Sequence, residues 1–229
     1  MPDSPPHQIA VRSAAPGYLT GFELDGLHPI GEPADEFATK TRLLDAAVRL
    51  FADHGYEASS MRELAGEVGV KAPAIYNHFD SKLDVLVTAI DYSVADFLRT
   101  VLPGLEEVPA DQRLYELLRR HVMYKTTDVA FARAHDKLLD ADFMRRVLPP
   151  ADYQRIAGAL TGYRNIIRDL VILAEPTAGD DPGVDLPVLV SALVALCDTV
   201  SAWFRPEGTL TAEAVAEQCG SIARRMVST

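Results

Sequence analysis

A run of three helices, of which the last two are short and separated by a glycine, is predicted over residues 39–79 and restricts the possible folds more than any other feature. The apolar face of the first helix is formed by Leu43, Ala47, Leu50 and Phe51. These positions recur with the period of an α-helix, and Gly55 suits the C-terminal cap of a helix over 39–54. The folded part of the chain is therefore expected to begin with an amphipathic helix.

The second and third helices are marked by their end signals. Ser60 and Glu63 have the spacing of a capping box, in which two side chains satisfy free N–H groups at the start of a helix. Gly69 ends this helix because glycine tolerates a positive φ. Pro73 is allowed in the first turn of a third helix, which is short because a new N-cap signal precedes Lys82. Two short helices backed by a longer one indicate a helix-turn-helix module.

The rest of the chain is also predicted to be helical, and no segment shows the sustained alternation of a strand. The further helices are expected over 82–102, 110–127, 129–139, 151–174, 184–204 and 211–227. The predicted fold is therefore all-α. Its expected divisions are a flexible arm (1–36), the helix-turn-helix module (37–84) and a larger helical domain (85–229).

Composition and charge limit the classes of protein. Residues 1–36 hold six prolines and four glycines, which is typical of a segment without regular structure. The formal net charge is −11, but residues 39–84 carry six Lys or Arg against seven acids and are close to neutral. An acidic protein binds nucleic acid poorly by bulk charge. Nucleic-acid binding would therefore depend on cations placed on one face.

The location of the protein is indicated by what the sequence does not contain. The longest apolar run, 186–197, is shorter than the roughly 20 residues of a membrane-spanning helix, and the N-terminus does not have the pattern of a secretory signal. Cys197 and Cys219 are too few for a disulfide framework and are expected to be small buried apolar residues. We expect no membrane span and a reducing cytoplasm.

The exposed face of the third helix has groups that can bind DNA. With Ile75 and Phe79 facing the core, the opposite face carries Lys71, Ala72, Ala74, Asn77 and His78, with Tyr76 at its margin. A lysine donates to phosphate or guanine, an asparagine pairs with adenine, and alanine methyls contact thymine. Ser59, Ser60, the start of the second helix at Met61, and Lys82 are expected to contact phosphates. The alternative is an ordinary solvated face of a helical bundle.

Several motifs at fixed spacing carry a resemblance to a known family. They are 41–51 (TRLLDAAVRLF), 55–56 (GY), 59–65 (SSMRELA), 68–70 (VGV), 75–79 (IYNHF) and 81–82 (SK). Together they resemble the N-terminal signature of the TetR family of transcriptional regulators over about 39–86. The resemblance implies a homodimeric, all-helical repressor that binds double-stranded operator DNA through its first three helices and a small effector through its larger domain.

The resemblance also implies roles for single residues. Tyr76, His78 and Lys82 would contact phosphates, while residues 71–74 and Asn77 would read bases. The sequence departs from the family pattern at Lys71, where serine or threonine is common, and at Pro73, where glycine or alanine is common. The bases that are read therefore cannot be carried over from the family.

The last two helices are predicted to form the dimer interface. Val215, Cys219, Ile222 and Met226 form a narrow apolar seam, and the preceding helix is apolar nearly all round, with Leu189, Leu193 and Leu196. A monomer would expose much apolar surface, so pairing as a four-helix bundle is expected. The alternative is that these residues form a core within one chain.

An effector site is expected in the larger domain. Segment 203–213 weakly resembles a turn of the TetR subgroup with acyl-CoA or fatty-acid effectors, which suggests a lipid-derived or CoA-thioester ligand. The candidate contacts are Tyr124, Tyr163, Arg164, Arg168 and Trp203. Arg164 and Arg168 share a helix face and can clasp a phosphate or carboxylate. The alternatives are that Arg168 pairs with Asp169 and that the tyrosines border the core.

The sequence leaves two alternatives to a regulator. An acyl-thioester-processing enzyme would need a nucleophile, a base and an orienting group, and helical spacings assemble none around His121 or His135. A helical ligand-binding protein without DNA binding is compatible with the acidic total charge. His54 and His78 have no third ligand at metal-site spacing, so no metal and no cofactor are expected.

Overall fold

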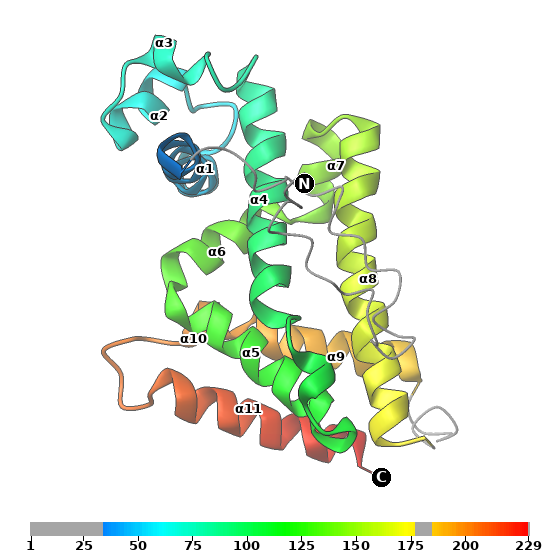
Figure 1. Cartoon of the computed structure of the whole chain (residues 1–229). Helices are drawn as coiled ribbons and strands as arrows, with labels where there is room; N and C mark the ends of the chain where they lie inside the picture. The colour runs from blue at the N-terminus through cyan, green and yellow to red at the C-terminus, as the bar shows by residue number, and fades with distance from the viewer. Residues whose placement is uncertain (1–33, 177–184, 229) are drawn as a thin grey trace, which may run out of the picture. The chain divides into compact units, whose positions relative to one another are not determined.

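The computed structural model describes residues 34–176 and 185–228. Within these two ranges every regular element is a helix, which confirms the predicted all-α fold (Figure 1). The elements are α1 (Ala34–His54), α2 (Met61–Val68), α3 (Ala72–Ile75), α4 (Lys82–Val101), η2 (Leu105–Glu107), η3 (Ala110–Gln112), α5 (Arg113–Thr127), α6 (Val129–Leu138), α7 (Ala141–Val147), α8 (Pro150–Ala174), α9 (Leu186–Asp198), α10 (Val200–Trp203) and α11 (Ala212–Val227).

Most helix ends lie close to their predicted positions, but some elements differ. The third helix stops at Ile75, and the backbone continues to Phe79 through turns such as the one closed by the His78 N–H on the Ile75 carbonyl at 2.9 Å. The helix predicted over 184–204 is divided at Thr199 into α9 and α10. Helix α1 begins at Ala34, five residues before its predicted start at residue 39. Residues 1–33, most of the predicted arm, lie outside the described residues.

Helix α7 was missing from the sequence-based prediction. Asp140 caps it, since its Oδ1 accepts a hydrogen bond of 2.8 Å from the backbone N–H of Phe143. Met144 is buried, and the helix ends before Pro149 and Pro150. The N-cap aspartate was the available signal.

The described chain divides into two compact units. The first holds 34–96 and 133–157, and the second holds 97–132, 158–176 and 185–228. The first unit is therefore larger than the predicted module over 37–84, because α7 and parts of α4, α6 and α8 join α1 to α3.

The core of the first unit positions the helix-turn-helix. Helix α1 packs against α2, and α2 packs against α3. The capping box predicted at Ser60 and Glu63 is present, and Gly69 ends α2 in the left-handed conformation with φ 72°. Ile75 and Phe79 are almost completely buried. The caps at both ends of α2 and the burial of Ile75 and Phe79 together hold α3 in place. The face of α3 opposite to Ile75 is therefore exposed.

A buried ion pair joins α4 and α8 within the first unit. Asp91 accepts a hydrogen bond from Arg155, which also pairs with Asp152 at 2.8 Å. Burial raises the pKa of Asp91 to about 6, and the hydrogen bond and charge of Arg155 only partly oppose this.

The raised pKa predicts a pH dependence of stability. The folded protein holds the Asp91 proton up to about pH 6 and the unfolded chain only up to about pH 4, so this stabilisation is complete below pH 4 and is lost as the pH rises through 6. We expect the free energy of unfolding of the wild type, relative to Asp91→Asn, to fall by about 2–3 kcal/mol between pH 4 and 7. Urea unfolding at several pH values measures it, and parallel profiles would contradict the assignment.

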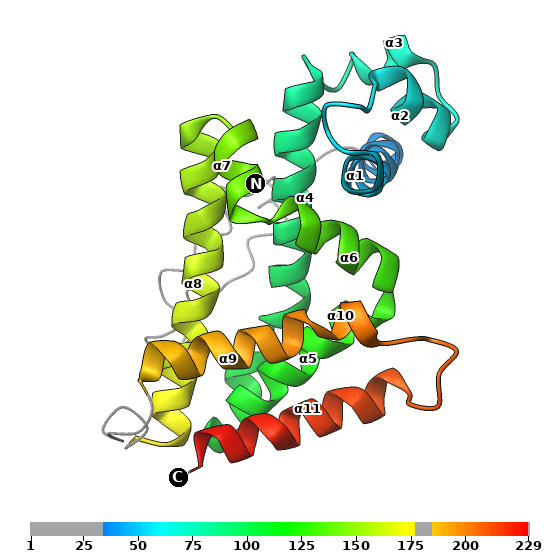
Figure 2. The same ribbon diagram turned by 180° about the vertical axis from the view of Figure 1, so that it is seen from behind.

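The core of the second unit is built from α5, α9 and α11. In Figures 1 and 2, α5 lies beside both α9 and α11, and contacts join all three helices. Gly220 of α11 lies against the ring of Tyr115 of α5, where a Cβ atom would be 2.1 Å from Cε2. Arg224 covers the same ring, with Cζ 4.6 Å from its centroid. Helix α11 is therefore packed closely against α5 at Gly220.

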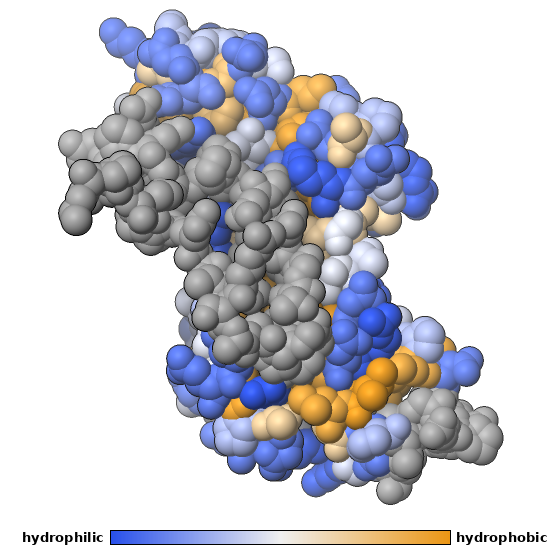
Figure 3. Space-filling view, turned by 45° about the vertical axis from the view of Figure 1, so that its right-hand side comes forward, coloured by the Kyte–Doolittle hydropathy of each residue, from blue (hydrophilic) through white to orange (hydrophobic). Residues whose placement is uncertain are grey.

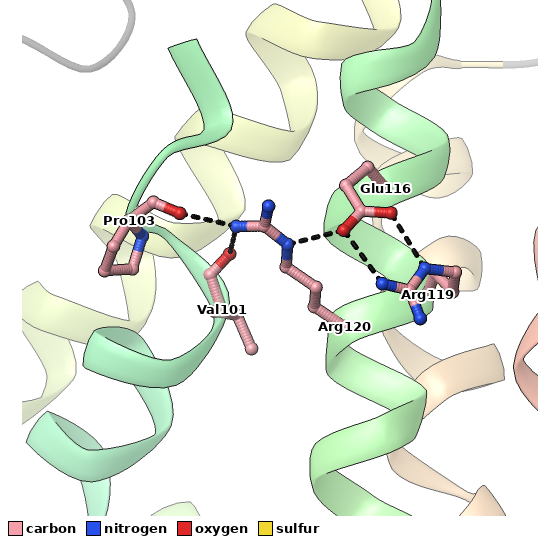
Figure 4. Close-up of polar contacts among 5 residues, drawn as sticks. All are labelled: Val101, Pro103, Glu116, Arg119 and Arg120. Carbon is pink, nitrogen blue, oxygen red and sulfur yellow. Dashed lines mark hydrogen bonds and ion pairs between the residues drawn. The ribbon is translucent and has the colours of Figure 1, made fainter. Parts of the chain in front are cut away.

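Arginine side chains of α5 fix the end of α4. Arg120 donates to the carbonyl oxygens of Pro103 at 2.6 Å and Val101 at 3.3 Å, and its Nε donates to Glu116 at 2.7 Å (Figure 4). Glu116 also accepts two hydrogen bonds from Arg119. A helix leaves its last carbonyl groups without partners, and cations stabilise that end. Arg120 thus caps the C-terminus of α4.

The most apolar part of the chain belongs to this core. Residues 186–203 are long and apolar enough to span a membrane by length and composition. Leu193, Cys197 and Val200 are fully buried, and α9 and α10 contact α5. Burial inside a helical unit accounts for part of this composition, since 39% of the segment is buried. We therefore assign the segment to the core of the unit and not to a membrane.

Candidate functional site

The outer face of α3 carries an exposed group of polar and small side chains. Lys71 is the N-cap residue with extended backbone, and its side chain is exposed and does not cap the helix. Tyr76 is 54% exposed, and Asn77 and Pro73 are exposed too. Ala72 and Ala74 are partly exposed. The structure thus brings together on one surface the residues predicted to read bases.

His78 lies at the edge of this surface. Its side chain is partly buried, and its ring meets the ring of Phe79 edge-on at 6.4 Å between centroids. The phosphate contact of His78 stays a prediction.

The start of α2 differs from the prediction. Ser59 is 4% exposed and donates its hydroxyl proton to the carbonyl of Gly55 at 2.7 Å, and Met61 is 8% exposed in the core. Neither residue can contact a phosphate without leaving the core, so these two predicted contacts are corrected.

Ser60 is exposed but is already engaged by Glu63. Its hydroxyl donates to the Glu63 carboxylate at 2.8 Å, and the same carboxylate accepts the Ser60 N–H at 2.7 Å. These hydrogen bonds hold the pKa of Glu63 below its usual value. The start of α2 is thus neutralised by a carboxylate of the chain itself and is a weaker anion site than the sequence suggested.

Lys82 makes contacts within the chain. Its Nζ donates to the carbonyl oxygens of Ser59 at 2.7 Å and Glu57 at 3.3 Å, and it lies 4.4 Å from the centroid of the Tyr56 ring. These contacts use two of the three N–H donors of the ammonium group. The phosphate contact of Lys82 stays a prediction.

The predicted effector residues divide into two groups. Tyr124 and Tyr163 come together around Phe97, with ring centroids 5.2 Å and 5.0 Å from that of Phe97. Arg164 is exposed on α8 away from them. Arg168 is also exposed and donates to Asp169 at 2.8 Å and to Asn165 at 3.2 Å, which is the alternative weighed from the sequence.

Trp203, the remaining predicted effector residue, is 50% exposed at the end of α10. No ring contact joins it to the tyrosines among the residues that the structure describes. The structure thus groups two of the predicted residues and leaves the two arginines and the tryptophan outside that group.

A chain of polar groups lies beside the grouped tyrosines. The Tyr163 hydroxyl is 3.0 Å from His121 Nδ1, His121 Nε2 is 3.0 Å from Asp198 Oδ1, and Lys125 Nζ is 3.2 Å from the same oxygen. Tyr163, His121 and Lys125 are at most 3% exposed, whereas the side chain of Asp198 is 43% exposed. We call these four residues the buried polar chain. It reaches from the core to the surface of the second unit.

The charges of the buried polar chain follow from its surroundings. Burial alone would raise the pKa of Asp198, but the hydrogen bond and charge of His121, with Lys125, hold it below its usual range. Burial raises the pKa of Tyr163 well above its ordinary value, so this hydroxyl stays protonated. Sequence reasoning missed the chain because its members are 42 and 77 residues apart, and helical spacing has no signal for such contacts.

The predicted dimer contacts are mostly used within the subunit. Leu189, Leu193, Val215 and Cys219 are at most 6% exposed in the core of the second unit. They cannot reach a partner without unpacking the subunit, so the predicted interface is corrected for these four. The reason is that the apolar seam of α11 packs on α5 of the same chain.

The other predicted contacts remain accessible. Ile222 is 44% exposed, and Leu196 and Met226 are partly exposed. Val188 of α9, which sequence reasoning did not select, is 60% exposed. Figure 3 shows apolar surface gathered in a band on the lower part of the molecule as drawn. Accessible apolar surface therefore remains on α9 and α11.

Candidate metal ligands are not grouped. Among residues 34–176 and 185–228, no three His, Cys, Asp or Glu side chains are placed to hold one ion. Cys197 and Cys219 are free and buried, as expected from the sequence, and burial raises the pKa of both thiols.

Comparison with known proteins gives matches along most of the chain. The model of bacterial regulatory proteins of the tetR family matches residues 43–89, and the model of the tetracycline-repressor-like C-terminal domain matches residues 107–227. The transcriptional repressor KstR2 of Rhodococcus jostii is 24% identical over 195 residues, which are 83% of this chain and 93% of that protein. The fatty acid metabolism regulator protein of Bacillus subtilis is 23% identical over 164 residues, which are 71% and 81% of the two chains.

Solved structures share the fold. The structure of AibR in complex with isovaleryl coenzyme A and operator DNA has a TM-score of 0.66 and 22% identity, and the match covers 80% of this chain and 97% of that one. The C-terminal family model alone covers more than half of the chain. The chain therefore belongs to the TetR family of bacterial regulatory proteins.

Proposed function

We propose that the protein is a homodimeric transcriptional repressor that binds operator DNA through the outer face of α3 and leaves it when a small effector binds the second unit. The observation that carries the proposal is the exposed group formed by Lys71, Tyr76 and Asn77 on a helix whose other side is anchored in the core. A solvated surface of a bundle would not need a lysine, an amide and a tyrosine hydroxyl beside small residues.

Each group on this face matches a feature of the major groove. Lys71 donates to guanine or to a phosphate, and Asn77 pairs with the adenine edge. Ala72 and Ala74 contact thymine methyl groups and let the helix approach closely. The Tyr76 hydroxyl donates to a phosphate. With His78, these residues form the proposed DNA contacts.

A dimer is needed because a single short helix reads few bases. Two recognition helices roughly 34–36 Å apart enter successive turns of the major groove. We propose that the accessible apolar residues Val188, Leu196, Ile222 and Met226 contribute to the contact between subunits. Burying them removes apolar surface from water, which favours association.

The effector is proposed to be an acyl-CoA thioester or a related lipid-derived molecule. A relative named for fatty acid metabolism and a protein of the same fold bound to isovaleryl coenzyme A support this class. We place the effector near the aromatic group around Phe97, where the predicted effector residues Tyr124 and Tyr163 come together. To change the protein from mostly DNA-bound to mostly free, the effector has to bind the free form about 5.5 kcal/mol more tightly than the DNA-bound form.

We propose binding and not turnover at this site. The Tyr163–His121–Asp198 sequence of contacts resembles a nucleophile, a base and an orienting group. However, burial raises the pKa of Tyr163, which makes its hydroxyl harder to deprotonate and a poor nucleophile. These properties favour a ligand-binding regulator over an acyl-thioester-processing enzyme. We propose that this regulator acts in the cytoplasm.

A DNA-binding measurement tests the function. Fluorescence anisotropy with duplexes from the protein's own upstream DNA should show affinity that falls steeply with salt, because phosphate contacts release counterions. Lys71→Ala and Tyr76→Ala should abolish binding, and acyl-CoA thioesters of increasing chain length should release wild-type protein. Arg225→Gln, an exposed change on α11, is the charge-matched control.

The results separate the proposal from its alternatives. Binding that is unchanged in Lys71→Ala would show that α3 is not the recognition helix. A wild type that binds an acyl-CoA but has no salt-sensitive DNA affinity would instead be a ligand-binding protein. Steady thioester hydrolysis by the purified protein would support the enzyme.

A further inference from the structure

We propose that the buried polar chain is a carboxylate-binding site which the side chain of Asp198 fills from within the protein, and that the effector carries a free carboxylate that takes the place of Asp198. The inference rests on the proposed function, because it assigns the chemical class of the effector of that same regulator. It starts from the unequal burial of the charged groups in the chain.

The donors of the site are fixed inside the second unit. The side chains of Lys125 and His121 are each 2% exposed, and both residues belong to α5. Lys125 Nζ lies 3.2 Å and His121 Nε2 lies 3.0 Å from the same oxygen, Asp198 Oδ1. Two donors that converge on one carboxylate oxygen give the arrangement that a bound carboxylate requires.

The direction of the His121 donor is set by Tyr163. Burial raises the pKa of Tyr163 well above its ordinary value, so its hydroxyl keeps its proton and donates it to His121 Nδ1 at 3.0 Å. With Nδ1 as an acceptor, a neutral imidazole carries its own proton on Nε2. The Nε2–H group therefore points at the carboxylate oxygen and is ready to donate to a ligand oxygen at the same position.

The carboxylate of Asp198 is the member of the site that is able to leave it. Its side chain is 43% exposed, and Asp198 is the last residue of α9, next to the break at Thr199. A change of side-chain rotamer takes this carboxylate into water, whereas Lys125 reaches water only if α5 unpacks. A buried ammonium group needs an anionic partner, and an incoming carboxylate supplies it.

An aromatic group adjoins these donors. The centroid of the Phe97 ring lies 4.7 Å from that of His121 and 5.2 Å from that of Tyr124, and Tyr124 is partly exposed. Ligand sites are mostly apolar, with a few polar groups that fix the orientation of the ligand. Fixed donors beside aromatic rings therefore match a molecule with a carboxylate at one end and an aliphatic chain, which is the chemistry of a lipid-derived acid.

The alternative is an ion pair that serves only the stability of the fold. Such a pair adds little net stability, because the cost of removing two charges from water offsets much of their attraction. The two roles make opposite predictions for Asp198→Ala. Loss of an internal competitor tightens the binding of a carboxylate, whereas loss of a structural partner loosens the site and weakens binding.

The experiment measures the binding of octanoate and of 1-octanol, which has the same chain without the carboxylate, by calorimetry at pH 7 on the full-length protein. We expect the wild type to bind octanoate about tenfold more tightly than 1-octanol, and Asp198→Ala to bind octanoate about tenfold more tightly again. The double variant Lys125→Met with Asp198→Leu should have no preference for octanoate. Arg225→Gln, an exposed change on α11, should behave as the wild type.

A second measurement decides the question if Asp198→Ala is too unstable for calorimetry. Acetate, compared with chloride at equal ionic strength, should raise the thermal unfolding midpoint of Asp198→Ala by about 2–4 °C at about five times its dissociation constant, and the rise should saturate. The double variant retains neither charge and should show no such rise. An Asp198→Ala protein that does not respond to acetate would overturn the inference.

The outcomes also separate this inference from the proposed function. Equal wild-type affinity for octanoate and 1-octanol, or weaker octanoate binding by Asp198→Ala, would overturn the carboxylate site. Release of the wild type from DNA by an acyl-CoA without a free carboxylate would overturn it too, and would leave the proposed function in place. Tighter octanoate binding by Asp198→Ala, with no DNA binding by the wild type, would instead count against the proposed function.

Discussion

Replacing Gly220 with alanine is expected to lower the free energy of unfolding by about 2–3 kcal/mol, a large effect for the addition of one methyl group. A Cβ atom at this position would lie 2.1 Å from Cε2 and 2.5 Å from Cδ2 of Tyr115. Non-bonded carbon atoms do not approach so closely, so the ring or α11 has to move. Either movement loosens the contact of α11 with α5 and the Arg224 side chain over the ring. Thermal or urea unfolding measures the loss.

Gly158→Ala is the matched control for this change. Gly158 is also in a helix, α8, but a Cβ atom there would have no heavy atom within 4 Å. Alanine favours a helix over glycine by about 0.5–1 kcal/mol, so this variant should be slightly stabilised. Adding Tyr115→Leu to Gly220→Ala should recover part of the lost stability. Equal effects of the two glycine substitutions would contradict the predicted clash.

Replacing Asp198 with alanine is expected to destabilise the protein by about 2–3 kcal/mol. The change removes the carboxylate that faces Lys125, whose side chain is 2% exposed, and it also removes a partner of His121. Breaking a buried ion pair from one side costs about 3–5 kcal/mol, and the 43% exposure of Asp198 reduces this through solvent screening. Urea unfolding at pH 7 measures the change.

The stability difference between wild type and Asp198→Ala should depend on pH, and the pKa of Asp198 decides the direction. The pKa of Asp198 lies below its usual range in the folded protein, so the stabilisation is present above about pH 4 and is lost as the pH falls. The difference between wild type and Asp198→Ala should therefore shrink in acid. The double variant Lys125→Met with Asp198→Leu, which removes both charges, should be close to neutral. A constant difference between pH 7 and pH 3 would argue against the ion pair.

The helices of the first unit were predictable because their signals are local. The capping box at Ser60, the left-handed Gly69 and the apolar spacing of α1 each lie within a few residues of the structure they determine. The face of a single helix on which a residue lies was equally predictable. Lys71 and Asn77 were expected on the outer face of α3, and both are exposed.

Contacts made between distant segments were not predictable in the same way. Lys82 is 23 residues from Ser59 in the sequence. Only the folded structure therefore shows that its ammonium group donates a hydrogen bond to the Ser59 carbonyl oxygen. Met61 has the spacing of either a buried or an accessible residue at a helix start, and tertiary packing decided the outcome. An apolar seam on α11 likewise predicts a partner helix but not whether that helix belongs to the same chain, and here α5 is the partner.

The proposed DNA-binding face of α3 has a further consequence for how the operator preference of such a protein can change. Ile75 and Phe79 anchor α3, while the side chain of Lys71 is exposed and takes no part in capping the helix. Substitutions of exposed residues away from caps and the core usually alter stability by less than about 0.5 kcal/mol. Among proteins related to this one, operator preference can therefore change through substitutions on the outer face of α3. The buried residues that hold this helix in place can stay the same.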